Sequence, residues 1–239
     1  MINGKLFDHT LLKAEATTSD INRLCQEAKE FDLASVCINP YWVTTCKENL
    51  ANTSVKVCTV IGFPLGAEKI STKIQEMQNA IQDGADEIDF VIHVGKLIEE
   101  DYEYIDQELK SLREHSEGKT LKAILETYLL SDDQIRKVSS LCSKNKIDFV
   151  KTSTGFAKGG ATLHAVKLIS ESIVGSTQIK ASTGIDSLSI VQDYIALGVT
   201  RFGTSKGIKI MSEQSNLEYI DTDQNSNYRN TYGSINQRK

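Results

Sequence analysis

The feature of this chain that most constrains its fold is a regular alternation of short apolar segments with longer segments of helical periodicity. In the segment 18–31, apolar side chains recur at the i, i+3, i+4 and i+7 spacing of one helix face, at Ile21, Leu24, Cys25 and Ala28. Expected helix caps are Ser19 or Asp20, Ser131 and Ser187. The apolar, β-branched segments expected to form strands are 33–39, 55–62, 86–93, 121–127, 148–153, 178–182 and 200–205. Apolar strands that alternate with amphipathic helices indicate a parallel sheet covered by helices.

The number of strands favours an α/β fold of the (β/α)8 TIM-barrel type. A short N-terminal element at 6–9 brings the seven segments to eight, and 239 residues is close to the roughly 250 of such a barrel. An open doubly wound sheet would accommodate six or seven strands, but the phosphate-type loops described below favour closure. We therefore expect one barrel domain over residues 1–212.

The last segment, residues 213–239, has a different composition. It is rich in Asn, Gln, Ser and Tyr and has almost no aliphatic side chain after Ile220. Such a composition offers little surface to bury, so we expect a disordered tail or a loosely docked lid.

Charge and hydropathy exclude several classes of partner. The formal net charge of −5 provides no basic surface for nucleic acid or an anionic membrane. The chain has no apolar run of about 18 residues and no N-terminal signal sequence, so we expect a cytoplasmic protein. The cysteines are odd in number, lack a CxxC pair, and are expected to be reduced core residues: Cys25, Cys37, Cys46, Cys58 and Cys142.

Two lysines within apolar strands are the candidate catalytic residues. Lys151 follows DFV, Lys180 follows QI, and nearly identical tails, KTSTG and KASTG, begin at the two lysines. A single lysine of this kind is more often a strand-end residue whose ammonium reaches solvent than a catalytic residue. A pair indicates chemistry, because a nearby cation and partial desolvation both favour the neutral amine that attacks a carbonyl. Each lysine is therefore expected to promote the neutral form of the other.

Asp89 is the candidate proton donor and acceptor. Overlaying 84–89 on 145–151 and 177–180 matches Asp89 with Lys151 and Lys180, although the tetrapeptide IDFV, present at 88–91 and 147–150, suggests a different overlay. A carboxylate beside a Schiff-base lysine can transfer the protons that carbinolamine dehydration and enamine formation require. A structural ion pair with Lys180 is the alternative.

Two loops near the end of the chain suggest phosphate binding. STGID at 182–186 and FGTSKG at 202–207 follow the last two strands, where barrels commonly bind phosphate through backbone N–H groups. The candidate substrate- and phosphate-binding residues are Thr154, Gly155, Thr183, Gly184, Gly203 and Ser205. Further candidates for the pocket, each with a structural alternative, are Asp8, Thr10, His93 and Glu126. The four histidines lack metal-ligand spacing, so no metal and no cofactor is expected.

These segments resemble the deoxyribose-phosphate aldolase family, in collinear order over residues 8–207. The matching segments are DHTLLK (8–13), LCQEA (24–28), VCINP (36–40), VCTVIGFPLG (57–66), GADEIDFVI (84–92), LKAILET (121–127), FVKTSTGF (149–156), GGAT (159–162), KASTGI (180–185) and RFGTSKG (201–207).

The resemblance implies a barrel that cleaves 2-deoxy-D-ribose 5-phosphate to D-glyceraldehyde 3-phosphate and acetaldehyde. It implies Lys151 as the Schiff base, Asp89 and Lys180 as proton-transfer residues, and Gly184, Gly203 and Ser205 as phosphate ligands. It also implies a role in deoxyribose phosphate catabolism and a homo-oligomer, expected to be a dimer.

The chain departs from the family pattern at two pocket positions. Thr183 replaces the usual first glycine of a Gly-Gly pair, and His93 replaces a more usual asparagine. The other functions that this sequence allows are a Schiff-base aldolase for a different sugar phosphate or keto acid, and a sugar-phosphate-binding barrel without turnover.

Overall fold

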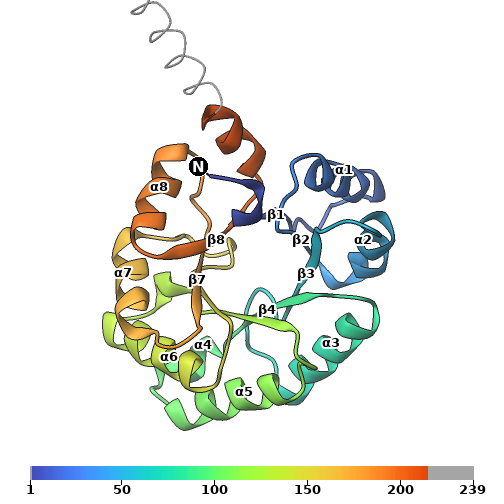
Figure 1. The fold of residues 1–239 in the computed structure, drawn as a ribbon. Helices are drawn as coiled ribbons and strands as arrows, with labels where there is room; N and C mark the ends of the chain where they lie inside the picture. The colour runs from blue at the N-terminus through green and yellow to red at the C-terminus, as the bar shows by residue number, and fades with distance from the viewer. Residues whose placement is uncertain (1, 215–239) are drawn as a thin grey trace, which may run out of the picture.

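Eight parallel strands form a closed barrel in chain order, which confirms the (β/α)8 prediction (Figure 1). The structure is a computed structural model and describes residues 2–214. The observed strands lie within two or three residues of the expected ones: β1 Phe7–Leu11, β2 Ser35–Ile38, β3 Lys56–Ile61, β4 Glu87–Val91, β5 Thr120–Ile124, β6 Phe149–Lys151, β7 Gln178–Ser182 and β8 Val199–Thr204.

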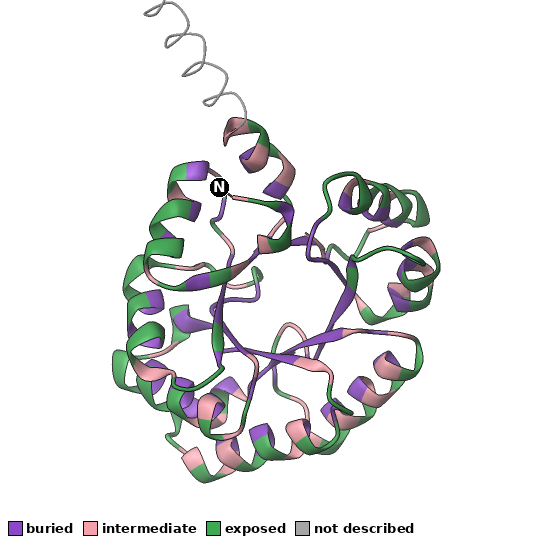
Figure 2. Ribbon diagram, in the orientation of Figure 1, coloured by how far each residue is buried: buried purple, intermediate pink, exposed green. Residues whose placement is uncertain are grey.

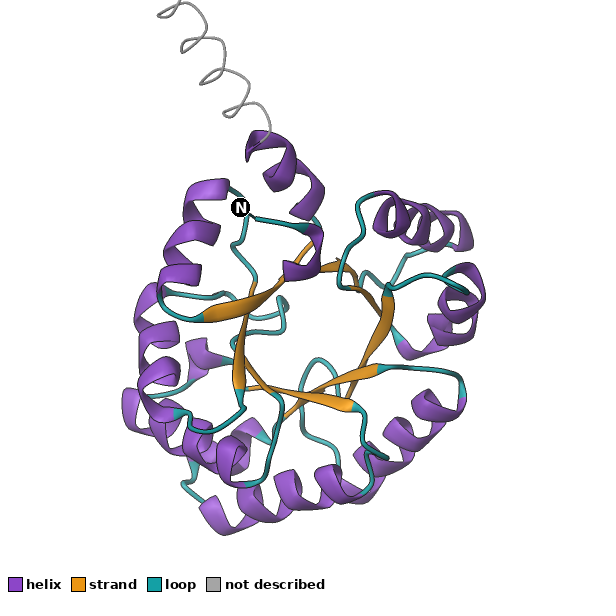
Figure 3. Cartoon of the chain, in the orientation of Figure 1, coloured by secondary structure: helices purple, strands orange, loops and turns teal. Residues whose placement is uncertain are grey.

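Helices cover the outside of the barrel on all sides (Figure 3). They are α1 Thr18–Glu30, α2 Val43–Asn49, α3 Ile70–Gln82, α4 Val94–Ile98, α5 Tyr102–Glu114, α6 Asp132–Lys144, α7 Leu163–Ser172 and α8 Leu188–Ala196. Three short 3-10 helices lie at Gly4–Leu6, Pro40–Trp42 and Thr127–Leu129, and a last helix occupies residues 207–214. Within the described residues, no helix has both the length and the apolar character needed to cross a membrane.

The helices form where the sequence provides both an apolar face and a cap. Helix α1 buries the four expected side chains, Ile21, Leu24, Cys25 and Ala28. Ser131 and Ser187 cap α6 and α8 as expected. The expected cap of α1 was wrong: Thr17 is the N-cap, and Asp20 is the reciprocal partner in a capping box, its carboxylate accepting from the Thr17 backbone N–H.

The boundary between barrel and tail lies near the end of the described residues. Glu213 accepts a hydrogen bond from the backbone N–H of Leu188, and Gln214 accepts one from that of Ile2. Both residues therefore contact the barrel. The expectation of a disordered or lid-like tail concerns residues that, from 215 onward, lie outside the described range.

The barrel has two different interiors. Between strands and helices, buried aliphatic and aromatic side chains form a continuous core, and the strands are buried along most of their length (Figure 2). A second, small apolar cluster is formed by Leu12, Cys37, Cys58 and Val60. Charged side chains from β1, β4, β5, β7 and β8 pair with one another inside the barrel. Such a charged interior is costly unless each ion is paired, so the paired cluster is a candidate functional site.

Candidate active site

The centre of the charged interior is Asp89 on β4, a fully buried carboxylate that contacts three lysines. The Lys122 ammonium lies 2.8 Å from Oδ1, whereas those of Lys151 and Lys180 lie 2.8 and 2.7 Å from Oδ2. Strands β5, β6 and β7 supply these lysines. The structure thus brings together the three residues singled out as catalytic candidates, and adds a fourth, Lys122, that was missed.

A second group of charges lies beside this centre. The Asp8 carboxylate on β1 lies 2.5 Å from the Lys180 ammonium and 2.6 Å from the Arg201 guanidinium, and it accepts a hydrogen bond from Ser35. Glu87 on β4 pairs with Lys122 at 2.6 Å and with Arg201 at 3.2 Å. Asp8 is therefore part of the buried ion-pair network and does not line the open pocket described below.

The strand register corrects the overlay used to align the candidates. Lys151 and Lys180 are direct partners in the β6–β7 pair, as expected. Asp89, however, pairs with Lys122, and Lys151 pairs through Ile124 with Val91. Asp89 therefore lies two residues before the position equivalent to Lys151. The IDFV overlay is also wrong, because it would align Val91 with Val150, whereas the register aligns Val91 with Lys151. The contact forms because a two-residue offset preserves the inward direction and lysine side chains are long.

The pKa of Lys180 does not show the lowering that was expected from a neighbouring lysine. Burial lowers the pKa of Lys180, but the adjacent Asp8 and Asp89 carboxylates outweigh it and raise this pKa above its ordinary value. Burial raises the pKa of Asp89, but Lys122, Lys151 and Lys180 outweigh it and hold this pKa well below its usual range. The neighbouring lysines produce no net lowering of the Lys180 pKa, because carboxylates lie between the ammonium groups. Lys180 is thus a cation and Asp89 an anion at neutral pH.

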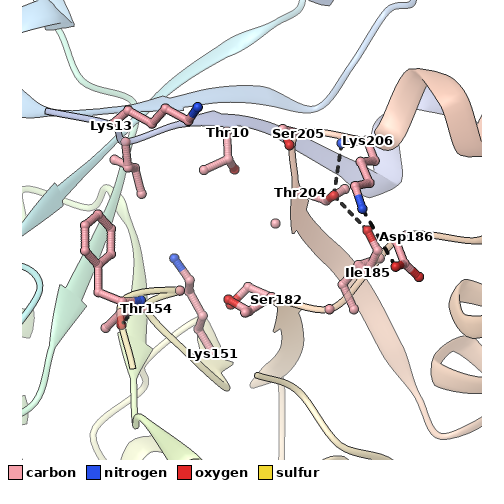
Figure 4. A pocket seen from close by; sticks show the side chains of 16 residues that line it. Thr10, Lys13, Lys151, Thr154, Ser182, Ile185, Asp186, Thr204, Ser205 and Lys206 are labelled. Carbon is pink, nitrogen blue, oxygen red and sulfur yellow. Dashed lines mark hydrogen bonds and ion pairs between the residues drawn. The ribbon is translucent and has the colours of Figure 1, made fainter. Parts of the chain in front are cut away.

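A pocket of about 370 Å³ opens above the cluster at the carboxyl ends of β1, β6, β7 and β8 (Figure 4). The Lys151 side chain points into it, with an exposed fraction of 3%. All six expected substrate- and phosphate-binding residues and Thr10 line this pocket. Its other lining residues, which sequence reasoning did not single out, are Leu12, Lys13, Phe156, Ser182, Ile185, Asp186, Thr204 and Lys206.

The wall formed by the β7 and β8 loops has unusual backbone geometry. Thr183 has a φ of 70° and Gly184 one of 83°, both in the left-handed region. The Thr183 carbonyl accepts a hydrogen bond from the Ala161 N–H, which ties this turn to the β6 loop. A threonine in this conformation is strained, because its branched Cβ crowds the backbone. At Gly203 the reason for glycine is close packing: a Cβ there would lie 3.1 Å from Cε of Lys180.

Two other pocket candidates lie outside this pocket. His93 is the N-cap of α4, where Nδ1 accepts from the Lys96 N–H and the ring packs edge-on against Tyr104. Glu126 has a φ of 55° and accepts hydrogen bonds from the hydroxyl and N–H of Thr154. It lines a smaller, adjoining pocket and so supports the main pocket wall from behind.

The thiols and carboxylates of the barrel interior include two groups close enough to hold a cation: Cys37, Cys58 and Asp89, and Asp8, Cys58 and Glu87. Each carboxylate in these groups already pairs with lysine or arginine. The basic side chains therefore occupy the positions of a bound cation. All five cysteines are free thiols and buried, as expected for core residues.

A family profile and two curated relatives identify the family of this chain. The profile of the DeoC/LacD family aldolases matches residues 4–213. The chain is 47% identical over 208 residues to a deoxyribose-phosphate aldolase of Finegoldia magna, covering 87% of this chain and 98% of the relative. It is 46% identical over 212 residues to that of Streptococcus uberis, covering 89% and 96%. The tetrameric deoxyribose phosphate aldolase of Aeropyrum pernix superposes with a TM-score of 0.82 at 28% identity, covering 90% of this chain and 91% of that one.

Proposed function

The chain belongs to the DeoC/LacD family of aldolases, and from this premise we propose that it cleaves 2-deoxy-D-ribose 5-phosphate reversibly through an imine on Lys151. The products would be acetaldehyde and D-glyceraldehyde 3-phosphate. The names of the relatives in Finegoldia magna and Streptococcus uberis support the substrate, and the geometry of the charged cluster supports the mechanism.

The observation that carries the mechanism is the position of Lys151 between the pocket and Asp89. Three lysines line the pocket, namely Lys13, Lys151 and Lys206. Lys206 pairs at 3.7 Å with an exposed carboxylate, that of Asp186. The Lys151 ammonium instead donates a hydrogen bond to buried Asp89, so a group that can move protons lies within reach of its nitrogen.

The balance of charge in the cluster supports release of one proton. The cluster contains three carboxylate side chains (Asp8, Glu87, Asp89) and four basic side chains (Lys122, Lys151, Lys180, Arg201). The cluster is electrically balanced when one cation is neutral. Lys151 is the one that lines the pocket, so it is the amine that can lose its proton as the substrate enters.

Imine formation follows from this state. The neutral Lys151 nitrogen attacks the C1 aldehyde of the open-chain sugar and forms a carbinolamine, which loses its hydroxyl as water to give the iminium. Departure of the hydroxyl requires a proton, and the Lys180 ammonium, which shares Asp89 Oδ2 with Lys151, can deliver it through that carboxylate. The iminium keeps the positive charge that the ammonium had, so the pairing with Asp89 persists.

Carbon–carbon cleavage uses the iminium as an electron sink. Removal of the C3 hydroxyl proton breaks the C2–C3 bond, its electron pair becomes the enamine π bond between C1 and C2, and C3 leaves as the aldehyde of glyceraldehyde 3-phosphate. Protonation of C2 restores an iminium, and water releases acetaldehyde and the free lysine. Asp89 and Lys180 are the proposed proton carriers for both transfers, because Lys151 and Lys180 contact the same oxygen of Asp89.

The phosphate is proposed to bind at the β7 and β8 loops, opposite the reacting carbon. Gly184, Gly203 and Ser205 line this side of the pocket, and Lys206 adds a cation. Backbone N–H groups at strand-to-helix turns, with one nearby ammonium, are typical of phosphate sites in barrels.

Replacement of Thr183 by glycine should lower KM for the phosphorylated substrate. Thr183 has a φ of 70°, a conformation that glycine adopts without strain, and removing its side chain opens the loop beside Gly155 and Gly184. Steady-state kinetics with deoxyribose 5-phosphate and with unphosphorylated deoxyribose check this, since kcat/KM for the latter should change little. A KM for the phosphorylated substrate that rises about tenfold would show instead that the Thr183 hydroxyl binds the phosphate.

The proposed activity is tested directly by incubating the protein with deoxyribose 5-phosphate and measuring acetaldehyde. Synthesis reactions with glyceraldehyde 3-phosphate should proceed with acetaldehyde as the donor and not with dihydroxyacetone phosphate or pyruvate. Preference for another donor would favour a different aldolase specificity. Stabilisation by the sugar phosphate without acetaldehyde release would favour a binding protein.

We also propose that the protein forms a homo-oligomer and acts in deoxyribose phosphate catabolism. The tetrameric relative from Aeropyrum pernix supports an oligomer, and the reaction itself converts a deoxy sugar phosphate into two smaller aldehydes. Light scattering after size-exclusion chromatography measures the number of subunits, and a monomer would contradict the first part.

A further inference from the structure

Lys122 is the residue of the charged cluster to which the mechanism above gives no role. It lies on β5, its side chain is fully buried, and it does not line the pocket. Its ammonium contacts Glu87 at 2.6 Å, Asp89 at 2.8 Å and the Cys58 thiol at 3.2 Å. A fully buried lysine is expensive to maintain, and a methionine of similar length would pack in an apolar interior without that cost. Its presence therefore needs a reason.

The contacts of Lys122 indicate that it acts on Lys151 through Asp89. Lys122 and the Cys58 thiol donate to Oδ1 of Asp89, while Lys151 and Lys180 both donate to Oδ2. This division fixes the carboxylate plane, so that a single oxygen faces both lysines involved in the proposed chemistry. It also divides the negative charge of Asp89 among three cations, so Asp89 holds the Lys151 ammonium less tightly than a simple pair would.

The charge balance of the cluster also depends on Lys122. With Lys122 present, the cluster has one cation more than it has carboxylates, and it balances when Lys151 is neutral. Without Lys122, three carboxylates would face three cations, and the cluster would balance with Lys151 protonated. The first state is suited to attack on an aldehyde and the second is not.

Resting on the proposed function, we propose that Lys122 is a positioning residue that acts through Asp89 so that Lys151 can react as the neutral amine. The charged and titratable groups that face Lys122 are Asp8 on β1, Cys58 on β3, Glu87 and Asp89 on β4, and the Lys180 ammonium on β7. Burial lowers the pKa of Lys122, but Asp89, Cys58, Glu87 and Asp8 together raise it well above its ordinary value. Lys122 therefore stays charged across the working pH range, as this role requires.

The test is the pH dependence of kcat/KM for deoxyribose 5-phosphate in Lys122→Met. The acid-side midpoint of this profile reports ionisations of the free enzyme and of the substrate. Because the substrate is the same for every variant, a difference from wild type belongs to the protein. We expect the midpoint to move about one pH unit upward, the effect of removing a nearby positive charge, and kcat at pH 7 to fall about tenfold. KM should stay within about twofold.

Lys73→Met is the matched control for the loss of a buried lysine. Lys73 is equally buried and pairs with Glu108 at 2.6 Å, between α3 and α5 on the outside of the barrel wall. We expect Lys73→Met to lower the melting temperature and to leave the acid-side midpoint of kcat/KM at its wild-type value. Lys122→Gln is a second test variant, equally neutral but still able to donate to Asp89. It should show the same upward shift of the acid-side midpoint. It also allows the shift to be measured if the methionine variant does not fold.

An unchanged midpoint in a folded, active Lys122 variant would overturn the inference, as would an equal shift in Lys73→Met. Either result would leave the proposed function in place, because wild-type turnover tests that separately. Wild type without turnover of deoxyribose 5-phosphate would contradict the proposed function and this inference together.

Discussion

Replacement of Lys151 by methionine should lower kcat/KM for deoxyribose 5-phosphate by about 10⁴-fold or more, since removal of a covalent nucleophile costs up to about 10⁶ in kcat where measured. Methionine is close in length, and its introduction leaves three carboxylates facing three cations in the cluster. The variant should therefore fold, as circular dichroism can verify. Acetaldehyde release, followed over hours, is the measurement.

The control is Lys167→Met, which removes an exposed lysine on α7 outside the pocket. It should keep wild-type kinetics. If Lys151→Met retained more than about one hundredth of wild-type turnover, Lys151 could not be the covalent residue, and another amine of the cluster would have to form the imine.

Replacement of Asp89 by asparagine has the second largest expected effect, and it acts on both catalysis and stability. Loss of the proton carrier should lower kcat by about 10²-fold or more. The neutral amide would also leave the buried cluster with two surplus cations, and breaking a buried ion pair costs about 3–5 kcal/mol. For a chain of this size that corresponds to a decrease of roughly 6–20 °C in Tm.

Calorimetry and steady-state kinetics separate the two effects, provided that turnover is measured well below the lowered Tm. The pKa of Asp89 is depressed in the folded state, so its contribution to stability is present above the unfolded pKa of about 4 and is lost as pH falls through the folded value. The wild-type and asparagine proteins should therefore differ in Tm at pH 7 and converge only in strong acid. A variant with wild-type kcat would show that Asp89 is purely structural.

Much of the fold could be predicted because the signal is local. Each strand is a short apolar segment and each helix shows a spacing of 3.6 residues, so the ends of the segments near 33–39 and 178–182 are visible without any knowledge of tertiary contacts. The cap of α1 was placed wrongly because Thr17, Ser19 and Asp20 are all good capping residues within four positions. Only the backbone geometry distinguishes them.

The site was predictable only in part, because its contacts join distant strands. Asp89 and Lys180 are 91 positions apart, and no local pattern gives the register between their strands. Lys122 was missed although LKAILET has the same local signal as the other two lysines, a charge inside an apolar strand. The raised pKa of Lys180 was missed because it depends on Asp8, which joins the cluster only when the barrel closes between β8 and β1.

Reductive trapping tests most directly whether Lys151 forms the covalent intermediate. The wild-type protein is incubated with acetaldehyde and borohydride, digested, and mapped by peptide mass spectrometry. We expect a reduced two-carbon adduct on Lys151 and a loss of activity in proportion to the modified fraction. An adduct confined to Lys180 or Lys122, or full activity without any adduct, would contradict the account.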